Sequence, residues 1–233
     1  ASIDFYRSEA LRMQGKPGAA ELYQNLISSS DSEIRLASRY RYGLFLMDRK
    51  EFAKARQMFV SAVSDDSIRQ TPFFRDAFRN AFMASKESGD AMGVARLYDT
   101  FLMYPADDKD KLAAAEYNLW AWLTIKDPSR TLSAAAEFLA LVEDPRRRTE
   151  VMLIQAQLYE TLKDTDQADR ILSGVLSKSE TPEDLRQSAE VKKVQLAMAR
   201  GPAGREILEE QLRQSRRGTW TGRAAEALIS MAV

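Results

Sequence analysis

The sequence predicts an all-α fold, and three observations lead to this prediction. Apolar residues recur with the 3.6-residue period of an amphipathic helix from end to end, whereas the alternation typical of β-strands is almost absent. Gly and Pro, which begin or end helices, divide the chain into segments of about 12 to 18 residues. The turns between these segments are short, which is typical of an all-α chain.

Each breaker stands where a helix is expected to begin or end. The first six helices are expected near residues 3–14, 18–29, 32–49, 51–64, 72–88 and 91–103, and the other seven near 109–126, 129–143, 147–163, 165–178, 182–200, 203–216 and 220–232. In chain order the breakers are GKPG at 15–18, the polar DRKE at 48–51, Pro72, Gly89-Asp90, Pro105, Asp127-Pro128, Pro145, Pro182 and Gly201-Pro202. None of these turns is long enough for an interdomain linker.

The composition excludes several classes of function. The 233 residues carry 34 Lys and Arg against 34 Asp and Glu, so a nucleic-acid-binding protein, which normally has a basic excess, is not expected. The absence of Cys excludes disulfides, thiolate metal sites and a Cys nucleophile, and the absence of His removes the commonest general base and transition-metal ligand. No apolar run approaches the roughly 18 residues that span a bilayer, and no signal peptide is visible.

Two stretches of the chain share a pattern of small and large residues at a constant offset of 113 residues. The paired positions are Gly43 with Ala156, Leu46 with Tyr159, Ala55 with Ala168, Phe59 with Leu172 and Ala62 with Val175. Small residues inside a helix allow two backbones to cross at close range. Gly43 costs its own helix about 0.5–1 kcal/mol relative to Ala, which is tolerable where it permits such a crossing.

This pattern resembles the tetratricopeptide repeat (TPR), a pair of antiparallel helices with small residues at fixed crossing positions. The resemblance implies a right-handed α-solenoid of about six such pairs plus a C-terminal helix, in a single domain over residues 1–233. Clear repeats are expected near 36–69 and 149–180, degenerate repeats near 3–29, 75–106, 114–145 and 182–216, and a terminal helix at 220–232. The last helix has no partner in the sequence, so it is expected either to cap the solenoid or to be followed by further chain. An uncapped end would expose Leu228, Ile229 and Met231, which favours a partner or self-association there.

The resemblance also implies a candidate binding site. In the TPR family, five positions of the first helix of each pair line a concave groove that holds a peptide segment or an amphipathic helix. The matching residues that we select are Tyr40, Leu44, Met47, Arg79, Met83, Lys86, Asn118 and Trp122. The alternative is that these side chains fill the core between repeats. The Lys and Asn carboxylate clamp of chaperone-tail binders is not reproduced.

The remaining charged motifs are interpreted as structural. Acidic clusters at 65–66, 107–110 and 180–184 stand next to expected helix starts, where carboxylates complement the helix dipole. The basic run at 145–148 is expected to be a solvated face, with a patch for an anionic partner as the alternative. The run at 213–218 closes an expected helix, where positive charge is favourable. GKPG lacks the spacing of a phosphate-binding loop, and no calcium-loop pattern occurs.

The sequence therefore predicts a non-catalytic protein-binding scaffold without cofactor or metal, whose partner is a protein rather than nucleic acid. By resemblance, its setting is a bacterial multi-protein assembly, possibly in the cell envelope. The alternative is a helical accessory region of a larger enzyme whose catalytic domain lies outside this chain. Both periplasm and cytoplasm are open, and the periplasm is preferred because such modules are common in envelope assemblies. The identity of the partner, the oligomeric state and whether the chain is a fragment are open.

Overall fold

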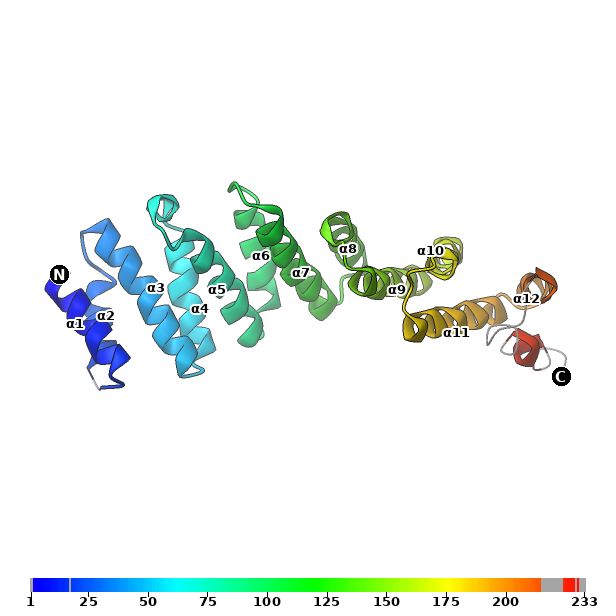
Figure 1. The fold of residues 1–233 in the computed structure, drawn as a ribbon, viewed down its shortest axis with the longest axis horizontal. Coiled ribbons are helices and arrows are strands. Elements are labelled where there is room, and N and C mark those ends of the chain that lie inside the picture. Colours follow the sequence, from blue (N-terminus) through cyan, green and yellow to red (C-terminus); the bar gives the residue numbers. More distant parts are fainter. Residues whose placement is uncertain (1, 17, 215–223, 229, 231–233) are drawn as a thin grey trace. The chain divides into compact units, whose positions relative to one another are not determined.

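The computed structural model describes residues 2–16, 18–214, 224–228 and 230, with the side chains of 210–214 left undescribed. All regular secondary structure within these ranges is helical (Figure 1). The all-α prediction is therefore confirmed. The helices also alternate with short turns, as the TPR-like pattern predicts.

The chain forms two compact units, which we call the N-terminal unit (residues 1–127) and the C-terminal unit (residues 128–233). The boundary at Asp127-Pro128 falls inside the repeat expected at 114–145. The pairing of the helices on either side of this boundary, and a single continuous solenoid over 1–233, stay predictions.

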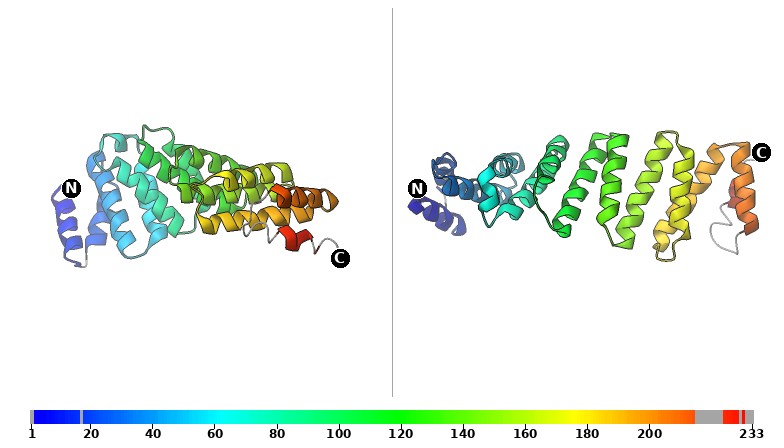
Figure 2. Two further views of the ribbon diagram at one scale, coloured as in Figure 1. Left: turned by 45° about the vertical axis from the view of Figure 1, so that its right-hand side comes forward. Right: turned by 90° about the horizontal axis from the view of Figure 1, so that it is seen from above.

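The N-terminal unit contains seven α-helices and one 3₁₀ helix among its described residues. They are α1 (Ser2–Met13), α2 (Ala19–Leu26), α3 (Ser32–Asp48), α4 (Phe52–Val63), η1 (Asp66–Gln70), α5 (Phe74–Glu87), α6 (Ala91–Phe101) and α7 (Asp108–Ile125). Helices α1 with α2, α3 with α4, and α5 with α6 pack as pairs, and α4 and α6 each also pack against the first helix of the next pair (Figure 2). Only η1 was not expected from the sequence.

Gly43 sits where α3 and α4 touch. A Cβ atom at Gly43 would lie 2.6 Å from Cε1 of Phe59, a distance that real Cβ atoms do not reach. Phe59, Ala55 and Ala62 on α4 are fully buried. The missing side chain therefore makes room for the Phe59 ring, so packing within the pair requires this glycine, but against a side chain and not against a neighbouring backbone as predicted.

Stacked aromatic rings connect successive pairs in the N-terminal unit. The ring of Tyr40 on α3 stacks on Phe73, just before α5, with centroids 4.8 Å apart. Phe82 on α5 stacks on Tyr117 of α7 at 5.3 Å. Such ring pairs stabilise a contact by about 0.5–1.5 kcal/mol beyond the area that they bury. The aromatic residues thus fix the spacing between neighbouring first helices.

The C-terminal unit contains five long α-helices among its described residues, besides the short helical stretch 224–228. They are α8 (Pro128–Leu141), α9 (Pro145–Thr161), α10 (Thr165–Ser177), α11 (Glu183–Ala199) and α12 (Pro202–Gln214). Ala156, Ala168, Leu172 and Val175, the residues paired by sequence with Gly43, Ala55, Phe59 and Ala62, lie together in one buried cluster. The two stretches that share the sequence pattern therefore bury the residues at these matched positions.

Residues of the expected terminal helix are described only in part. Residues 224–228 are helical, and Ala224 and Ala227 are buried against Leu208 on α12. Leu228 is partly buried against the same cluster. Self-association through this helix stays a prediction, and two of its large apolar residues, Ile229 and Met231, lie outside the described residues.

Each of the helices α1, α3, α5, α7, α9 and α11 ends in the same way. One or two residues beyond it stands a residue with positive φ, between 58° and 75°. These residues are Gly15, Lys50, Gly89, Lys126, Lys163 and Gly201, separated by 35, 39, 37, 37 and 38 residues. A left-handed residue after a helix satisfies its last carbonyl groups and turns the chain back. This recurrence marks six helix ends at one near-constant period.

The charged motifs act mostly as predicted. Asp65 accepts a hydrogen bond from the backbone N–H of Ser67 at the start of η1, and Asp107 accepts one from Asp110 at the start of α7. The basic run at 145–148 is not simply a solvated face, because Arg148 donates to the backbone carbonyls of Leu139 and Val142 at the end of α8. The side chains of the run at 213–218 lie outside the described part of the chain.

Candidate binding site

All eight residues predicted to bind a partner lie in the N-terminal unit. Tyr40, Leu44 and Met47 come from α3, Arg79, Met83 and Lys86 from α5, and Asn118 and Trp122 from α7. Helix α5 contacts both α3 and α7. The fold thus brings the three groups onto neighbouring first helices, as the resemblance implies.

Burial divides the eight residues into two kinds. Arg79, Met83 and Lys86 are exposed, with 38% of Met83 accessible, and Leu44, Met47 and Trp122 are partly exposed. Tyr40 and Asn118 are only 8% and 6% accessible. Tyr40 and Asn118 therefore fill the core, as the alternative interpretation predicted. The other six side chains are accessible to a partner.

The environment of Tyr40 agrees with a packing role. Its ring contacts Phe59 and Phe73, and burial raises the pKa of its hydroxyl, with a smaller contribution from the nearby Asp76 carboxylate. Tyr40 belongs to α3 and Asp76 to α5, so the phenol stands where the two first helices meet. It stabilises the scaffold beneath the candidate surface.

A small aromatic hollow lies between α5 and α7. Its lining includes Phe74, Phe78, Phe82, Phe101 and Tyr117, and its volume is about 20 Å³. The rings of Phe78 and Phe101 meet edge to face at 5.6 Å. An unfilled space of this size holds one methyl group or one water, and an aromatic lining favours the methyl group.

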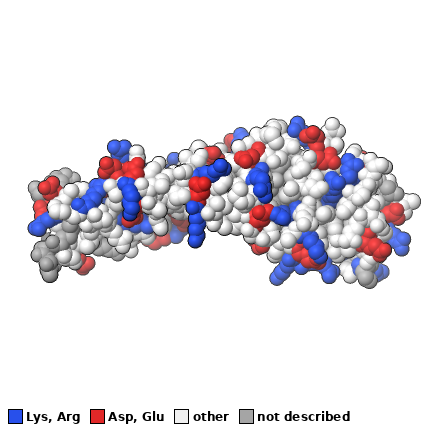
Figure 3. Space-filling view, turned by 180° about the vertical axis from the view of Figure 1, so that it is seen from behind, with Lys and Arg blue, Asp and Glu red and all other residues white. Residues whose placement is uncertain are grey.

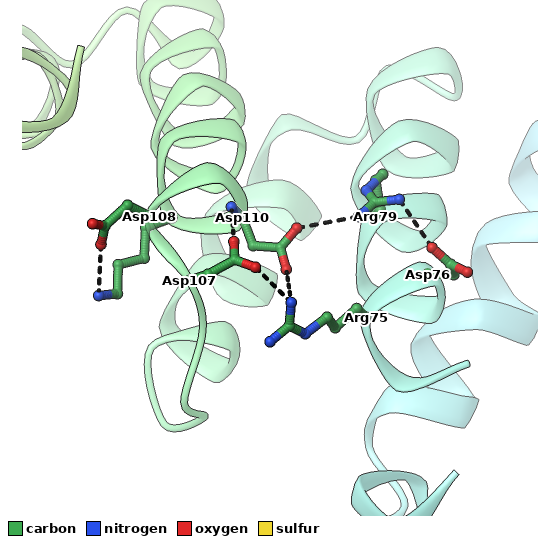
Figure 4. A network of polar contacts seen from close by, with 7 residues as sticks. Arg75, Asp76, Arg79, Asp107, Asp108 and Asp110 are labelled. Carbon is green, nitrogen blue, oxygen red and sulfur yellow. Dashed lines mark hydrogen bonds and ion pairs between the residues drawn. The ribbon is translucent and has the colours of Figure 1, made fainter. Parts of the chain in front are cut away.

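Charged side chains surround this hollow and pair with one another (Figure 4). The guanidinium of Arg75 contacts Asp107 and Asp110, the latter at 3.7 Å. Arg79 contacts Asp76 at 2.9 Å and Asp110 at 3.2 Å. Two arginines of α5 therefore reach aspartates at the start of α7 and tie the two first helices together.

The start of α7 favours the ionised form of its capping carboxylate. The backbone N–H of Asp110 and, less strongly, the Arg75 guanidinium lower the pKa of Asp107. Figure 4 also shows Asp108, which contacts Lys111 one turn further along the same helix at 3.2 Å. The acidic cluster at 107–110 is thus occupied in capping and ion pairs, and nothing in this arrangement points to an acid–base pair.

Lys86 crosses from α5 to the aromatic residues of α7. Its Nζ atom lies 5.8 Å from the ring centroids of both Tyr117 and Trp120. A cation over an aromatic face is stabilised by about 0.5–1 kcal/mol at an exposed site. The candidate surface therefore combines apolar side chains with two cations that already have partners within the chain. Arg79 pairs with aspartates, and Lys86 lies near aromatic rings.

Charges of both signs are interspersed on the face seen in Figure 3, where neither sign gathers into a large patch. This agrees with the equal numbers of basic and acidic residues in the sequence. Within the described residues, no group of three or more Asp and Glu side chains is placed to hold a metal ion. Over the same part of the chain, no helix is both long and apolar enough to cross a membrane.

Sequence reasoning missed the residues that form the hollow. Phe74, Phe78 and Phe82 recur every fourth residue on α5, which places them on one face of that helix. That spacing was a usable signal for an aromatic stripe. No signal in the sequence could have predicted that Arg75 and Arg79 pair with Asp107 and Asp110. These ion pairs depend on how α5 and α7 are placed in space.

The fold defines an all-α helical-repeat protein built from TPR-like antiparallel helix pairs. No family model matches the chain, and no curated protein matches it. Among solved structures, the chain is similar to a tetratricopeptide repeat protein from Parabacteroides merdae ATCC 43184. The two are 15% identical, the match covers 99% of this chain and 91% of that chain, and the TM-score is 0.49. Because the identity and the TM-score are this low, the similarity is limited to the arrangement of helices, and no function is inferred from it.

Proposed function

We propose that this chain is a protein-binding module and that a partner segment lies across α3, α5 and α7 of the N-terminal unit. One observation carries the proposal: an aromatic hollow between α5 and α7 has a rim of charged side chains that already neutralise one another. Such a surface offers an apolar contact without demanding a charged ligand. The role needs no catalytic group, and its setting is a multi-protein assembly.

The partner segment is an extended peptide or an amphipathic helix that presents apolar side chains. Burying an apolar side chain contributes about 25 cal/mol per Å² of area removed from water. Met83 and the partly exposed Leu44, Met47 and Trp122 supply that area from all three first helices. Methionine adapts to partners of different shape, because its side chain is unbranched and flexible.

The test compares two exposed methionines of the same unit. Met83 lies on α5 within the proposed surface, and Met92, 45% accessible, lies on α6, the second helix of the same pair. Proteins retained by immobilised wild type, Met83→Glu and Met92→Glu chains would be quantified by mass spectrometry. We expect Met83→Glu to lose at least one partner by about tenfold or more, because a buried carboxylate opposes apolar contact.

Circular dichroism of the three chains is the folding control. Since both methionines are exposed, neither substitution is expected to change the helix content. The proposal is wrong if Met83→Glu retains every protein that Met92→Glu retains, in the same amounts. It is equally wrong if both variants lose the same proteins, because the surface on α5 would then have no special role.

A further inference from the structure

A second hollow lies on different helices of the N-terminal unit. It runs between α4 and α6, the second helices of two successive pairs, and has a volume of about 500 Å³. Its polar lining includes Arg56, Gln57 and Ser61 from α4, Ser85 from α5, and Asp90 and Arg96 around the start of α6. We call it the α4–α6 groove. Its volume falls within the range of known ligand sites, about 300–1,000 Å³.

The charges in the α4–α6 groove do not cancel. Its one carboxylate, Asp90, caps α6 by accepting from the backbone N–H of Gly93 at 2.9 Å and also pairs with Arg56. Arg96 is exposed, and among the described residues its guanidinium has no ion pair or hydrogen bond. The lining therefore carries one cation in excess, and that cation is available to a ligand.

The groove also presents hydrogen-bond donors that nothing in the chain uses. The amide of Gln57 and the hydroxyl of Ser61 have no partner within the described ranges. They stand four residues apart on α4, which corresponds to about 6 Å along a helix. Carbonyl groups on one edge of an extended peptide recur every second residue, at about 7 Å, so the two donors match that spacing.

A buried hydroxyl provides an independent observation. Ser85 is fully buried at the base of the groove, and its Oγ atom has no hydrogen bond among the described residues. More than nine in ten buried polar groups have a partner, because leaving one unpaired costs about 1–3 kcal/mol. A ligand oxygen entering between α4 and α6 supplies the acceptor that this hydroxyl lacks.

We propose that the α4–α6 groove binds an acidic peptide segment of a protein partner. A carboxylate of the peptide pairs with Arg96, and its backbone carbonyls accept from Gln57 and Ser61. The groove uses α4 and α6, whereas the proposed partner surface uses α3, α5 and α7. This second site therefore does not depend on the proposed function.

The probe is a fluorescein-labelled hexaglutamate peptide, whose binding is followed by fluorescence anisotropy at low salt. We expect Arg96→Glu to weaken binding by at least tenfold and added salt to weaken binding to the wild type. The matched control is Arg170→Glu. Arg170 lies six residues after the cap Asp164 of α10, as Arg96 lies six residues after Asp90, and Arg170 also has no partner in the described part of the chain. Arg170→Glu is expected to bind like the wild type.

Two further variants and a competition with inorganic phosphate separate this proposal from its rivals. Met83→Glu is expected to leave hexaglutamate binding unchanged, so failure of the proposed function does not affect this result. Ser85→Ala is expected to weaken binding at least threefold without lowering the melting temperature, because the hydroxyl it removes is unpaired. The proposal is overturned if hexaglutamate does not bind, if Arg96→Glu binds as well as wild type, or if inorganic phosphate competes as effectively as unlabelled peptide.

Discussion

At the scale of single residues, the space next to each helical glycine determines what the glycine does. At Gly43 a Cβ atom would overlap the Phe59 ring. At Gly174, inside α10, the nearest atom to such a Cβ is the terminal methyl of Met152, at the ordinary contact distance of 3.9 Å. The first glycine is required by packing, whereas the second only lowers the helix propensity of its segment.

Replacing each of these glycines by Ala is expected to give opposite results. Gly43→Ala lowers the free energy of unfolding by about 1–2 kcal/mol, because overpacking costs about 1–3 kcal/mol and the better helix propensity returns only part of it. Gly174→Ala raises it by about 0.5–1 kcal/mol. Urea denaturation followed by circular dichroism measures both changes. The double change Gly43→Ala with Phe59→Leu should cost less than the two single changes added together. Simple additivity would mean that the ring is not what Gly43 accommodates.

The same scale shows what the sequence was able to predict. Gly43, Ala55 and Ala62 were placed correctly, because small residues at fixed spacing have one physical reason to recur. Tyr40 was expected to face a partner, yet it is buried by stacking on Phe73. Phe73 lies in the turn before α5, and helical periodicity gives no information on where a turn places its side chains.

At the scale of elements, the end of each first helix needs a left-handed residue. Gly adopts this conformation without strain, but Lys50 and Lys163 adopt it at φ values of 58° and 65°. A residue with a Cβ pays about 1–2 kcal/mol in that region. Both lysine side chains are exposed, so they gain little packing in return. These two turns are therefore strained in a way that the equivalent turns at Gly89 and Gly201 are not.

Lys50→Gly and Lys163→Gly are each expected to raise the free energy of unfolding by about 0.5–1 kcal/mol. Glycine removes the strain of the left-handed conformation, but it also gives the unfolded chain more conformational entropy, which offsets part of the gain. The control is Lys178→Gly after α10, where φ is −85° and any residue fits. There the substitution only adds freedom to the unfolded chain and should lower stability by about 0.4–1 kcal/mol. Thermal melts of the three variants measure the signs. Destabilisation by all three would show that the left-handed turns carry no strain.

Helix boundaries were predictable because breakers and caps act locally, but η1 and the ion pairs were not. The segment Asp66–Gln70 was taken as part of a turn, and a single 3₁₀ turn has no periodicity to detect. Arg146 pairs with Asp184, 38 residues further along, and this contact lowers the pKa of the Asp184 carboxyl. Such a pair joins α9 to α11 and follows from the stacking of first helices, which sequence spacing alone does not fix.

At the scale of the whole molecule, stability in a stacked helical chain is a sum of repeats and their nearest-neighbour contacts. The chain forms two compact units, so a defect in one is expected to stay within it. Each unit contains a helical glycine at which an added Cβ atom would overlap a neighbouring helix, so a defect can be introduced there. Gly43 serves for the N-terminal unit. In the C-terminal unit, a Cβ at Gly204 on α12 would lie 1.6 Å from the carbonyl oxygen of Ala197 on α11.

Hydrogen exchange measured by mass spectrometry on Gly43→Leu and Gly204→Ala would show how far each defect spreads. Gly43→Leu is expected to speed exchange in α3 and α4, and less in their neighbours α2 and α5, while α9 to α12 keep wild-type protection. Gly204→Ala is expected to do the reverse, loosening α11 and α12 and leaving α3 to α6 unchanged, because neither overlap reaches beyond the adjacent helices. Each variant thus serves as the control for the other. If either substitution accelerated exchange uniformly from α2 to α12, the two units would unfold as one cooperative body and the nearest-neighbour description would fail.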